Sequence, residues 1–349
     1  MVQRHLSARR QKSIGNADGV AAREDAVMDP ELAATALVER VRARPWGLAV
    51  AAIGSGRTTI RIDEGADPIG ESTLFQIGSI TKTMTGVLLA DAVIRGETTL
   101  ATTVGELFGT AAGRCTDITL LDLATQRSGL PRLPPNLDLA TIDQADPYAA
   151  YTADDLIAAL DIVDVASRGT YAYSNMGFMV LGLALGRVTA TPFAELIQQR
   201  LFGTLGLRNA RCPSPLDGDD VAPGYSGPAQ VPWWRTNLPG PGGVGMSIAD
   251  LAVYLRAHVE PDTTPIGEAV TLATQMHTTE PSAMGLGWGH KGGGLFHDGG
   301  TGGFRSFVAF HRPTATGVAL LANSAEADVV TAAGFAVLTQ MARETAASG

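Results

Sequence analysis

Apolar residues recur at helical spacing in two separate parts of the first hundred residues. Residues 29–44, which open on an Asp-Pro pair suited to a helix start, have the pattern of one amphipathic helix. Residues 79–95 show the same spacing until Gly96 stops it. Between these helices, apolar and β-branched runs at 47–53 and 58–63 flank a Gly-Ser-Gly turn, which predicts a β-hairpin.

The middle of the chain, about residues 100–245, alternates helical patterns with loops rich in proline and glycine. The predicted helices of this part span 154–162, 174–187 and 192–201, the last of them capped by Thr191. Helix and loop therefore dominate the middle, and no strand pattern stands out there.

The C-terminal part returns to longer regular patterns. Ser247 is predicted to cap a helix that reaches about residue 258. Two apolar runs, 304–310 and 317–323, are typical of strands on either side of an Arg-Pro turn. From Ser324 onward the chain is predicted to form a long alanine-rich helix.

These elements favour an α+β fold of the α/β-sandwich type. One antiparallel β-sheet flanked by the N- and C-terminal helices accounts for both ends of the chain, with a mostly helical domain inserted between them. The predicted boundaries put the sheet domain at 29–100 and 245–349 and the helical, loop-rich insert at 101–244. Residues 1–28 are predicted to be a disordered extension.

Composition narrows the class of protein. The 349 residues are 45% hydrophobic and 17% charged, which is ordinary for a globular protein. Acidic residues outnumber basic ones by 35 to 26, and the net charge of −9 disfavours binding to nucleic acid or to anionic membranes. The two cysteines, Cys115 and Cys212, are too few for a disulfide scaffold and favour free thiols over a single bridge.

The apolar runs are too short for a membrane span, because a transmembrane helix needs about 18 apolar residues. The N-terminal segment carries Arg4, Arg9, Arg10 and Lys12 but lacks the apolar core of a secretory signal. A transit-like segment is the alternative to a disordered extension there. A cytoplasmic location is expected by default.

Several enzyme classes lack their motifs in this chain. No lysine follows a Gly-x-x-x-x-Gly phosphate loop, no Gly-x-Gly-x-x-Gly pattern opens a helix after a strand, and no His-Glu-x-x-His zinc pair occurs. The Gly-x-Ser-x-Gly elbow of other serine hydrolases is also missing. We therefore expect no metal and no organic cofactor.

Ser79 and Lys82 form a candidate nucleophile and base. Ser79 follows Gly78 at a predicted helix start, and Lys82 lies one turn further on the same face, so its amine can reach the hydroxyl. Free N–H groups at the helix start favour a developing oxyanion, and a desolvated lysine can act as a base. The alternative is a plain helix cap followed by a solvated lysine.

Tyr173 and Asn175 form a second candidate pair, about ninety residues after Ser79. A phenol near a cationic lysine can have a depressed pKa and can transfer protons. An asparagine amide can hold the lysine and bond a substrate carbonyl. Taken alone, the pair is better explained as a core tyrosine and a helix-capping asparagine.

A third candidate is the glycine-rich stretch 297–304, which leads into a predicted strand. Its glycines allow a substrate to lie close to the strand backbone. The N–H of Gly300 can then complete an oxyanion hole with that of Ser79, while His297 would supply a donor or a cation at the rim of the cleft. The alternative is a glycine-rich turn with an incidental histidine.

The order and spacing of the three motifs resemble the serine β-lactamase and penicillin-binding-protein superfamily. The likeness is greatest to class C β-lactamases, to D-alanyl-D-alanine carboxypeptidases with a Tyr-Ser-Asn motif, and to related esterases and transacylases. The resemblance covers about residues 30–345 and says little about the substrate. Four further stretches have the texture of that family: 126–131, 201–207, 241–247 and 285–288.

The resemblance implies a role for each residue of the first two motifs. Ser79 matches the nucleophile that forms an acyl-enzyme, and Lys82 matches its general-base partner. Tyr173 matches a base that also serves deacylation. Asn175 matches the amide that orients the lysine and the substrate.

The third motif is matched by His297 and Gly299, with two departures that bear on the substrate. A lysine commonly stands in the place of His297, where it recognises a carboxylate. Asp298 replaces a threonine and puts a negative charge where an anionic group would sit, so efficient penicillin hydrolysis is not expected. Lys291 or Arg305 could compensate, but both are expected to be exposed charges.

The sequence therefore predicts a serine hydrolase or acyltransferase that forms an acyl-enzyme on Ser79 with a small ester or amide. The alternative is a true class C-type β-lactamase or a D-alanyl-D-alanine carboxypeptidase, and a second alternative is a catalytically silent binding protein. Trp233 and Trp234 are candidates for an aromatic substrate wall, with core packing of at least one as the other interpretation. The sequence does not indicate an oligomeric state.

Overall fold

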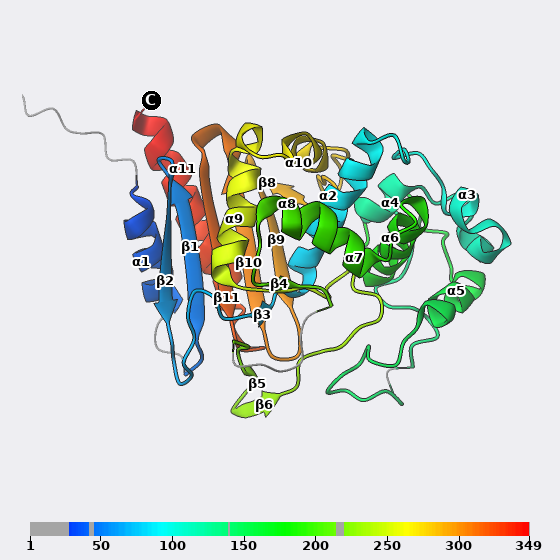
Figure 1. The fold of residues 1–349 in the computed structure, drawn as a ribbon, viewed down its shortest axis with the longest axis horizontal. Coiled ribbons are helices and arrows are strands. Elements are labelled where there is room, and N and C mark those ends of the chain that lie inside the picture. The colour runs from blue at the N-terminus through cyan, green and yellow to red at the C-terminus, as the bar shows by residue number, and fades with distance from the viewer. Residues whose placement is uncertain (1–27, 42–44, 139, 214–219, 349) are drawn as a thin grey trace, which may run out of the picture.

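The computed structural model describes residues 28–41, 45–138, 140–213 and 220–348. An antiparallel sheet stands between helices on its two faces, and a lobe of helices and loops lies to one side of it (Figure 1). The α+β architecture predicted from the sequence is therefore confirmed. The predicted extension falls outside the described residues except for Met28, whose side chain is buried under the N-terminal helix.

The main sheet has six strands in the order β2–β1–β11–β10–β9–β8, and every pairing in it is antiparallel. Strands from the two ends of the chain therefore pair with each other at its centre. The strands are β1 (Leu48–Gly54), β2 (Arg57–Asp63), β8 (Gly289–Lys291), β9 (Gly294–Gly300), β10 (Arg305–His311) and β11 (Thr316–Ala322).

Helices cover both faces of this sheet because its central strands are continuous apolar runs. On β1, Leu48 and Val50 face the core under α1 and α11, whereas Ala49 and Ile53 face the larger core on the other side, where α9 packs. Helix α10 lies beside α9, and α2 lies beside α10. The helices of these layers are α1 (Pro30–Val41), α2 (Thr81–Ile94), α9 (Ile248–Val259), α10 (Gly267–Thr274) and α11 (Val329–Ser348).

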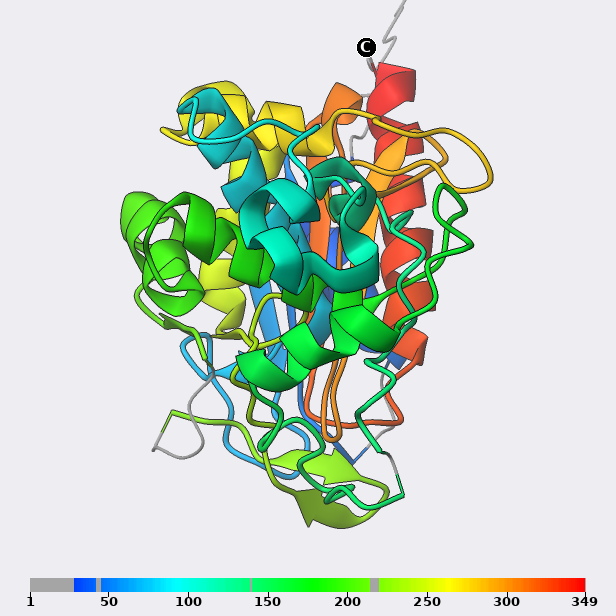
Figure 2. The same cartoon turned by 90° about the vertical axis from the view of Figure 1, so that its right-hand side faces the viewer.

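The lobe comes from the middle of the chain, and Figure 2 shows its helices in front of the sheet. Its helices are α3 (Val104–Phe108), α4 (Leu120–Ala124), α5 (Ala153–Ile162), α6 (Asn175–Val188), α7 (Phe193–Ile197) and α8 (Gly203–Leu205). Its short strands are β4 (Ala210–Arg211), β5 (Gly224–Ser226) and β6 (Ala229–Val231).

A small sheet joins the lobe to the rest of the molecule. In it, β7 (Gly245–Met246) lies between β3 (Phe75–Gln76) and β4. Segments on both sides of the expected domain boundaries thus share one sheet. The boundaries at 101 and 244 stay a prediction.

Several predicted elements differ from the observed ones at their ends. Thr191 does not cap α7, because Pro192 occupies the N-cap and the Thr191 hydroxyl donates to the carbonyl of Thr189. The C-terminal helix begins at Val329, since the Ser324 hydroxyl accepts the N–H of Glu326 and holds a turn before it. The predicted end of the first helix, residues 42–44, lies outside the described residues.

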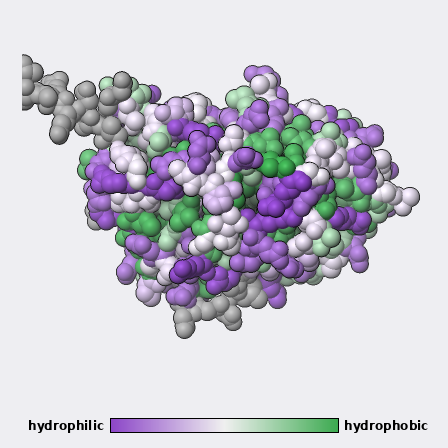
Figure 3. All heavy atoms as spheres, turned by 45° about the horizontal axis from the view of Figure 1, so that its top comes forward, coloured by the Kyte–Doolittle hydropathy of each residue, from purple (hydrophilic) through white to green (hydrophobic). Residues whose placement is uncertain are grey.

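Apolar side chains on the surface are scattered rather than gathered on one face. On the side drawn in Figure 3, hydrophobic patches alternate with hydrophilic ones. The exposed large hydrophobic side chains come from different parts of the chain and are Leu32, Ile94, Ile162, Val253 and Met276. Both cysteines, Cys115 and Cys212, are free thiols, as expected.

Among the described helices, none is by itself long and apolar enough to cross a membrane, although the bent pair Asn175–Val188 and Phe193–Leu205 meets those criteria together.

Candidate active site

Ser79 lies where a tight turn touches strand β9 backbone to backbone. The 3₁₀ turn Gly78–Ile80 leads directly into α2. Gly78 has a φ of +50°, and a Cβ on it would stand 2.7 Å from the backbone nitrogen of Gly300. A Cβ on Gly299 would collide with the carbonyl oxygen of Ile77. Glycines on both sides therefore bring the Ser79 backbone beside that of Gly300.

Lys82 is fully buried, with an exposed fraction of 0%, so the alternative of a solvated lysine is wrong. Its Nζ lies 3.0 Å from Ser79 Oγ, 2.8 Å from Asn175 Oδ1 and 2.7 Å from the carbonyl oxygen of Pro241. The amine thus lies within hydrogen-bonding distance of three oxygen atoms. Its position on the first turn of α2 gives it the reach predicted from the motif spacing.

Tyr173 completes the cluster around the serine. Its hydroxyl donates to Ser79 Oγ at 2.6 Å, and Lys82 Nζ lies 4.8 Å from the centre of its ring. The next residue, Ser174, caps α6 by accepting the N–H of Gly177. Gln126 holds this loop from the other side, because its side-chain oxygen accepts the N–H of Ser174 at 2.7 Å. The structure therefore brings the first two motifs together.

Burial controls the protonation of Lys82. Desolvation lowers its pKa well below the ordinary value, the Arg132 guanidinium lowers it further, and only the Asp298 carboxylate opposes them. Among the described residues, no carboxylate is bonded to the ammonium, so burial shifts the equilibrium toward the neutral amine. A neutral amine is the form that can accept a proton from a serine.

Burial also controls the protonation of Tyr173, and it shifts the pKa of the phenol in the direction opposite to the predicted one. Desolvation raises the pKa of the phenol well above its ordinary value, although the hydrogen bond with Ser79 partly opposes the shift. The prediction that Lys82 depresses this pKa is wrong, because desolvation of the buried phenol is the largest effect on it and raises the pKa. Tyr173 is therefore a protonated donor at neutral pH.

His297 lies behind Tyr173 rather than at the rim of the cleft. It is 8% exposed, its ring centre is 6.5 Å from that of Tyr173, and its Nδ1 lies 2.6 Å from the carbonyl oxygen of Asp298. Burial, and then the proximity of Lys82, lowers its pKa to about 4. The prediction of a cation at the rim is thus wrong, because β9 turns this side chain inward and Asp298 outward.

Two cavities meet at Ser79. The Tyr173 cavity, about 490 Å³, is lined by Tyr173, Arg132 and Asp298 as well as by the serine. The Trp234 pocket, about 60 Å³, has Trp234 on its wall and does not include Tyr173. Both include Asn175, Gly300 and Trp234, so a carbonyl group bound at Ser79 adjoins both cavities.

The two tryptophans have different surroundings. Trp234 lies on the cavity wall and meets Tyr148 edge to face at 5.6 Å. Trp233 is 5% exposed, packs on Phe304 at 5.2 Å and donates its indole N–H to the carbonyl of Ala222. Trp233 is therefore a core residue and not part of a substrate wall.

The backbone of Trp234 is fixed by Gln76, three residues before the serine. Gln76 Nε2 donates to the Trp234 carbonyl at 2.8 Å, and its Oε1 accepts the Trp234 N–H at 3.1 Å. The side chain is 3% exposed, so these bonds are shielded from water. One strand residue thus ties the aromatic wall to the turn that carries Ser79.

Several residues of the cavities were not found from the sequence. Arg132 lies 5.3 Å from the Tyr173 ring centre and lines its cavity, and it directly follows the quoted stretch 126–131. Tyr148 has no motif around it. The carbonyl of Pro241 leaves no sequence signal, because any residue could supply it.

The two charges considered for anion binding already have partners, although Arg305 lines the Tyr173 cavity. Arg305 forms an ion pair with Asp328 at 2.8 Å, and Lys291 lies over the ring of Phe335 at 4.7 Å. Among the residues that the structure describes, no group of histidine, cysteine or carboxylate side chains is arranged to hold a metal ion.

Comparison with known proteins identifies the family of this chain. The family model described as Beta-lactamase matches residues 34–340. The chain belongs to the beta-lactamase family. The superfamily resemblance predicted from the three motifs is thereby confirmed, and membership of this family supports a function of the serine-hydrolase type.

Individual relatives of the family are distant in sequence. The chain is 28% identical over 257 residues to a beta-lactamase of Escherichia coli (strain K12), a match covering 69% of this chain and 65% of the relative. It is 27% identical over 198 residues to a beta-lactamase of Providencia stuartii, covering 55% and 49%. It is 27% identical over 283 residues to penicillin-binding protein 4 of Amycolatopsis lactamdurans, covering 72% of each. The two beta-lactamase matches thus cover about half and about two thirds of the relatives' own length.

Proposed function

We propose that this chain is a serine hydrolase or acyltransferase that forms an acyl-enzyme on Ser79 with a small ester or amide. The observation that carries the proposal is the contact of Ser79 Oγ with two proton-carrying groups, Lys82 Nζ at 3.0 Å and the Tyr173 hydroxyl at 2.6 Å. A serine in contact with a neutral amine and a phenol has both a base and an acid at hand.

Lys82 is the base in this proposal. A neutral amine has two N–H bonds and one lone pair. Its two N–H bonds are directed to the carbonyl oxygens of Asn175 and Pro241, at 2.8 and 2.7 Å. The lone pair is then left for the hydroxyl proton of Ser79. Asn175 and the Pro241 backbone therefore orient the amine for proton transfer.

Tyr173 is the acid that serves the leaving group. When Ser79 Oγ bonds to the substrate carbonyl carbon, its proton passes to Lys82. As the tetrahedral intermediate collapses, the bond to the leaving group breaks and that group takes the proton of the Tyr173 hydroxyl. The Lys82 ammonium then returns a proton to Tyr173, so the cluster ends neutral. Water or another acceptor releases the acyl group by the reverse sequence.

The backbone N–H groups of Ser79 and Gly300 are the proposed oxyanion donors. Both belong to cavity-lining residues, and the glycine contacts between the turn and β9 hold them side by side. Donors fixed before the reaction stabilise the developing charge without reorganisation, which commonly contributes a factor of about 10²–10³ in rate.

A β-lactamase or D-alanyl-D-alanine carboxypeptidase activity is the second candidate. It is favoured by the names of the relatives, which include beta-lactamases and a penicillin-binding protein. The exposed Asp298 carboxylate on the wall of the Tyr173 cavity opposes it, because it would repel an anionic substrate group. Measurable turnover of nitrocefin, or a stable penicilloyl adduct, would favour this candidate over a simple ester.

The test of the proposal is hydrolysis of p-nitrophenyl acetate by the wild-type chain and by Ser79→Ala. We expect the variant to lose at least about 10³-fold in kcat/KM, since no other nucleophile replaces the serine. Ser167→Ala, which changes an exposed serine outside the cavities, is the matched control and should keep full activity. Full activity of Ser79→Ala would show that the assignment is wrong. A wild-type chain inert to esters and to a fluorophosphonate would point to a binding protein.

A further inference from the structure

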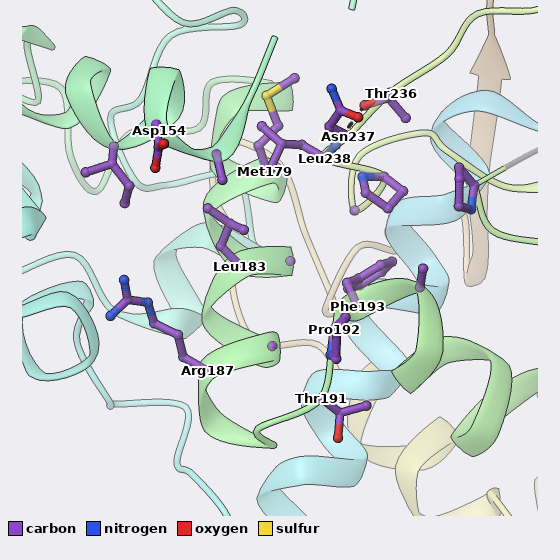
Figure 4. Close-up of a pocket in the computed structure, with 18 of the residues that line it drawn as sticks. Asp154, Met179, Leu183, Arg187, Thr191, Pro192, Phe193, Thr236, Asn237 and Leu238 are labelled. Atoms are coloured by element: carbon purple, nitrogen blue, oxygen red, sulfur yellow. Dashed lines mark hydrogen bonds between the residues drawn. The ribbon is translucent and has the colours of Figure 1, made fainter. Parts of the chain in front are cut away.

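A third cavity, larger than either of those at Ser79, lies along helix α6. It has a volume of about 640 Å³, well within the range of small-molecule sites. Figure 4 shows Met179, Leu183 and Arg187 following one another along α6 on one wall, with Phe193 across from them and Leu238 beside Met179. We call this space the α6 cavity. Nothing in the proposed reaction steps uses it.

The floor of the α6 cavity continues directly from the residues at Ser79. Asn175, which contacts Lys82, is followed at intervals of four residues by Met179, Leu183 and Arg187. Residues spaced by four lie on one face of a helix. Twelve residues of helix span about 18 Å, so this face leads from the amide beside the lysine to the far end of the cavity.

The α6 cavity also shares a wall with the Trp234 pocket. Met179, Thr236 and Leu238 line both spaces. Met179 and Leu238 are 3% and 4% exposed, and each of them borders both spaces. Methionine is unbranched and flexible, so it can change rotamer to widen the passage.

The position of Tyr173 indicates which part of a substrate would lie in the Trp234 pocket. The leaving group must depart toward the acid that protonates it, and Tyr173 lines the Tyr173 cavity but not the Trp234 pocket. The acyl part therefore lies in the Trp234 pocket. At about 60 Å³ that pocket holds only a small group, and a longer acyl chain has to continue past Met179.

We infer that the α6 cavity is the binding site for an extended, uncharged aliphatic acyl chain of the substrate. The inference rests on the proposed acyl-enzyme on Ser79 and adds to it a substrate class, medium-chain acyl esters or amides. The lining is largely apolar and includes Phe108, Ile157, Leu183 and Phe193. The one guanidinium there, that of Arg187, already lies 4.3 Å over the ring of Phe108. It therefore gives no reason to expect an anionic group at the end of the acyl chain.

The experiment compares p-nitrophenyl acetate with p-nitrophenyl octanoate. Leu183→Trp fills the cavity from α6, where the leucine is half-buried, and Ile157→Trp fills it from α5. We expect each variant to lose at least about tenfold in kcat/KM for the octanoate, the scale of discrimination in an apolar pocket, and little for the acetate. Leu121→Trp changes another half-buried leucine of the same core, outside the cavities, and should affect the two esters equally.

The outcomes separate this inference from the proposed function. If the wild type hydrolyses both esters and the cavity-filling variants keep the octanoate-to-acetate ratio, the α6 cavity does not hold the acyl chain and the inference fails alone. If Leu121→Trp lowers that ratio as strongly as Leu183→Trp, the effect is on the fold and the inference also fails. If neither ester reacts with the wild type, the proposed function fails, and the inference with it.

Discussion

Burial sets the charge of the reactive side chains at Ser79. Lys82 and His297 have lowered pKa values and Tyr173 has a raised one, and desolvation is the largest cause in each case. All three shifts favour the neutral form. The reactive groups are thus shifted toward their neutral forms. The charged side chains on the cavity wall are Arg132, Asp298, Arg305 and Asp328, and of these Arg132 and Asp298 act on Lys82 through space.

Arg132 and Asp298 should shift the pH profile in opposite directions. Arg132 lowers the pKa of Lys82 and Asp298 raises it, and a base must be deprotonated to work. Arg132→Gln should therefore move the acid limb of kcat/KM to higher pH, and Asp298→Asn should move it to lower pH. Because both side chains are exposed, we expect shifts of up to about one pH unit that shrink in high salt.

The measurement is kcat/KM for a neutral ester against pH at low and high ionic strength. Shifts of the same sign in both variants, or an acid limb unaffected by either, would show that Lys82 does not control the limb. The double variant provides a check, since opposing electrostatic effects should largely cancel.

Reactive residues could be predicted from the sequence where their spacing is local. Ser79 and Lys82 are one helical turn apart, so their contact follows from helix geometry alone. The direction of the Tyr173 pKa shift could not be predicted, because it depends on burial by segments far away in the chain. The same holds for Arg132, whose place beside Tyr173 follows from the path of a loop.

At the scale of elements, the contact between β9 and the turn at 78–80 positions the site. The Ser306 hydroxyl on β10 donates to the Ile77 carbonyl at 2.8 Å and fixes the turn from a second strand. Gly299 has no side chain to hold the turn and β9 apart. Backbone packing between a sheet and a helix start thus aligns the two proposed oxyanion donors.

Gly299→Ala should damage activity far more than stability. Its Cβ would meet the carbonyl oxygen of Ile77, so the turn and β9 must move apart. A displacement of about 1 Å at a reacting centre can cost about a hundredfold, and we expect at least that loss in kcat with p-nitrophenyl acetate. Melting temperature, measured in parallel, should fall by only a few degrees.

Gly54→Ala is the control for Gly299→Ala, because it changes a strand glycine away from Ser79. Gly54 ends β1, and a Cβ there would meet the flexible end of Met341 at 3.3 Å. It should leave kcat unchanged. Equal activity of Gly299→Ala and Gly54→Ala would mean that close contact between β9 and the turn is not needed.

Elements with a regular apolar pattern could be predicted from the sequence, and those without one could not. The hairpin of β1 and β2, helices α5 and α6, and strands β10 and β11 match the predicted segments closely. Strand β9 stands out in the sequence only as a glycine-rich stretch, because Asp298 and three glycines interrupt its apolar pattern. Its strand conformation comes from pairing with β10.

At the scale of the whole molecule, buried histidines make the fold sensitive to acid. His258 lies in the core, with its ring 4.4 Å from that of Tyr254 and 4.9 Å from that of Trp288. Burial lowers its pKa from 6.5 to about 3, while the Tyr254 carbonyl opposes the shift and Arg312 adds to it. The folded protein thus keeps this ring neutral where an unfolded chain would protonate it.

The sign of the effect on stability follows from proton binding. Between about pH 6.5 and 3 the unfolded chain binds a proton at His258 that the folded chain does not, so the free energy of unfolding falls as pH falls. One histidine contributes about 1.4 kcal/mol per pH unit in that window. His258→Phe should reduce the slope by about that amount, measured by urea denaturation between pH 4 and 6. An unchanged slope would show that His258 is protonated in the folded state.

The proposed chemistry depends on a covalent bond at Ser79. Its most direct test is intact-mass and peptide analysis of the wild-type chain after brief exposure to p-nitrophenyl octanoate and acid quench. The account predicts a mass increase of one octanoyl group, mapped to Ser79 and absent from Ser79→Ala. Turnover with no adduct at any time, or an adduct on another residue that persists in Ser79→Ala, would contradict it.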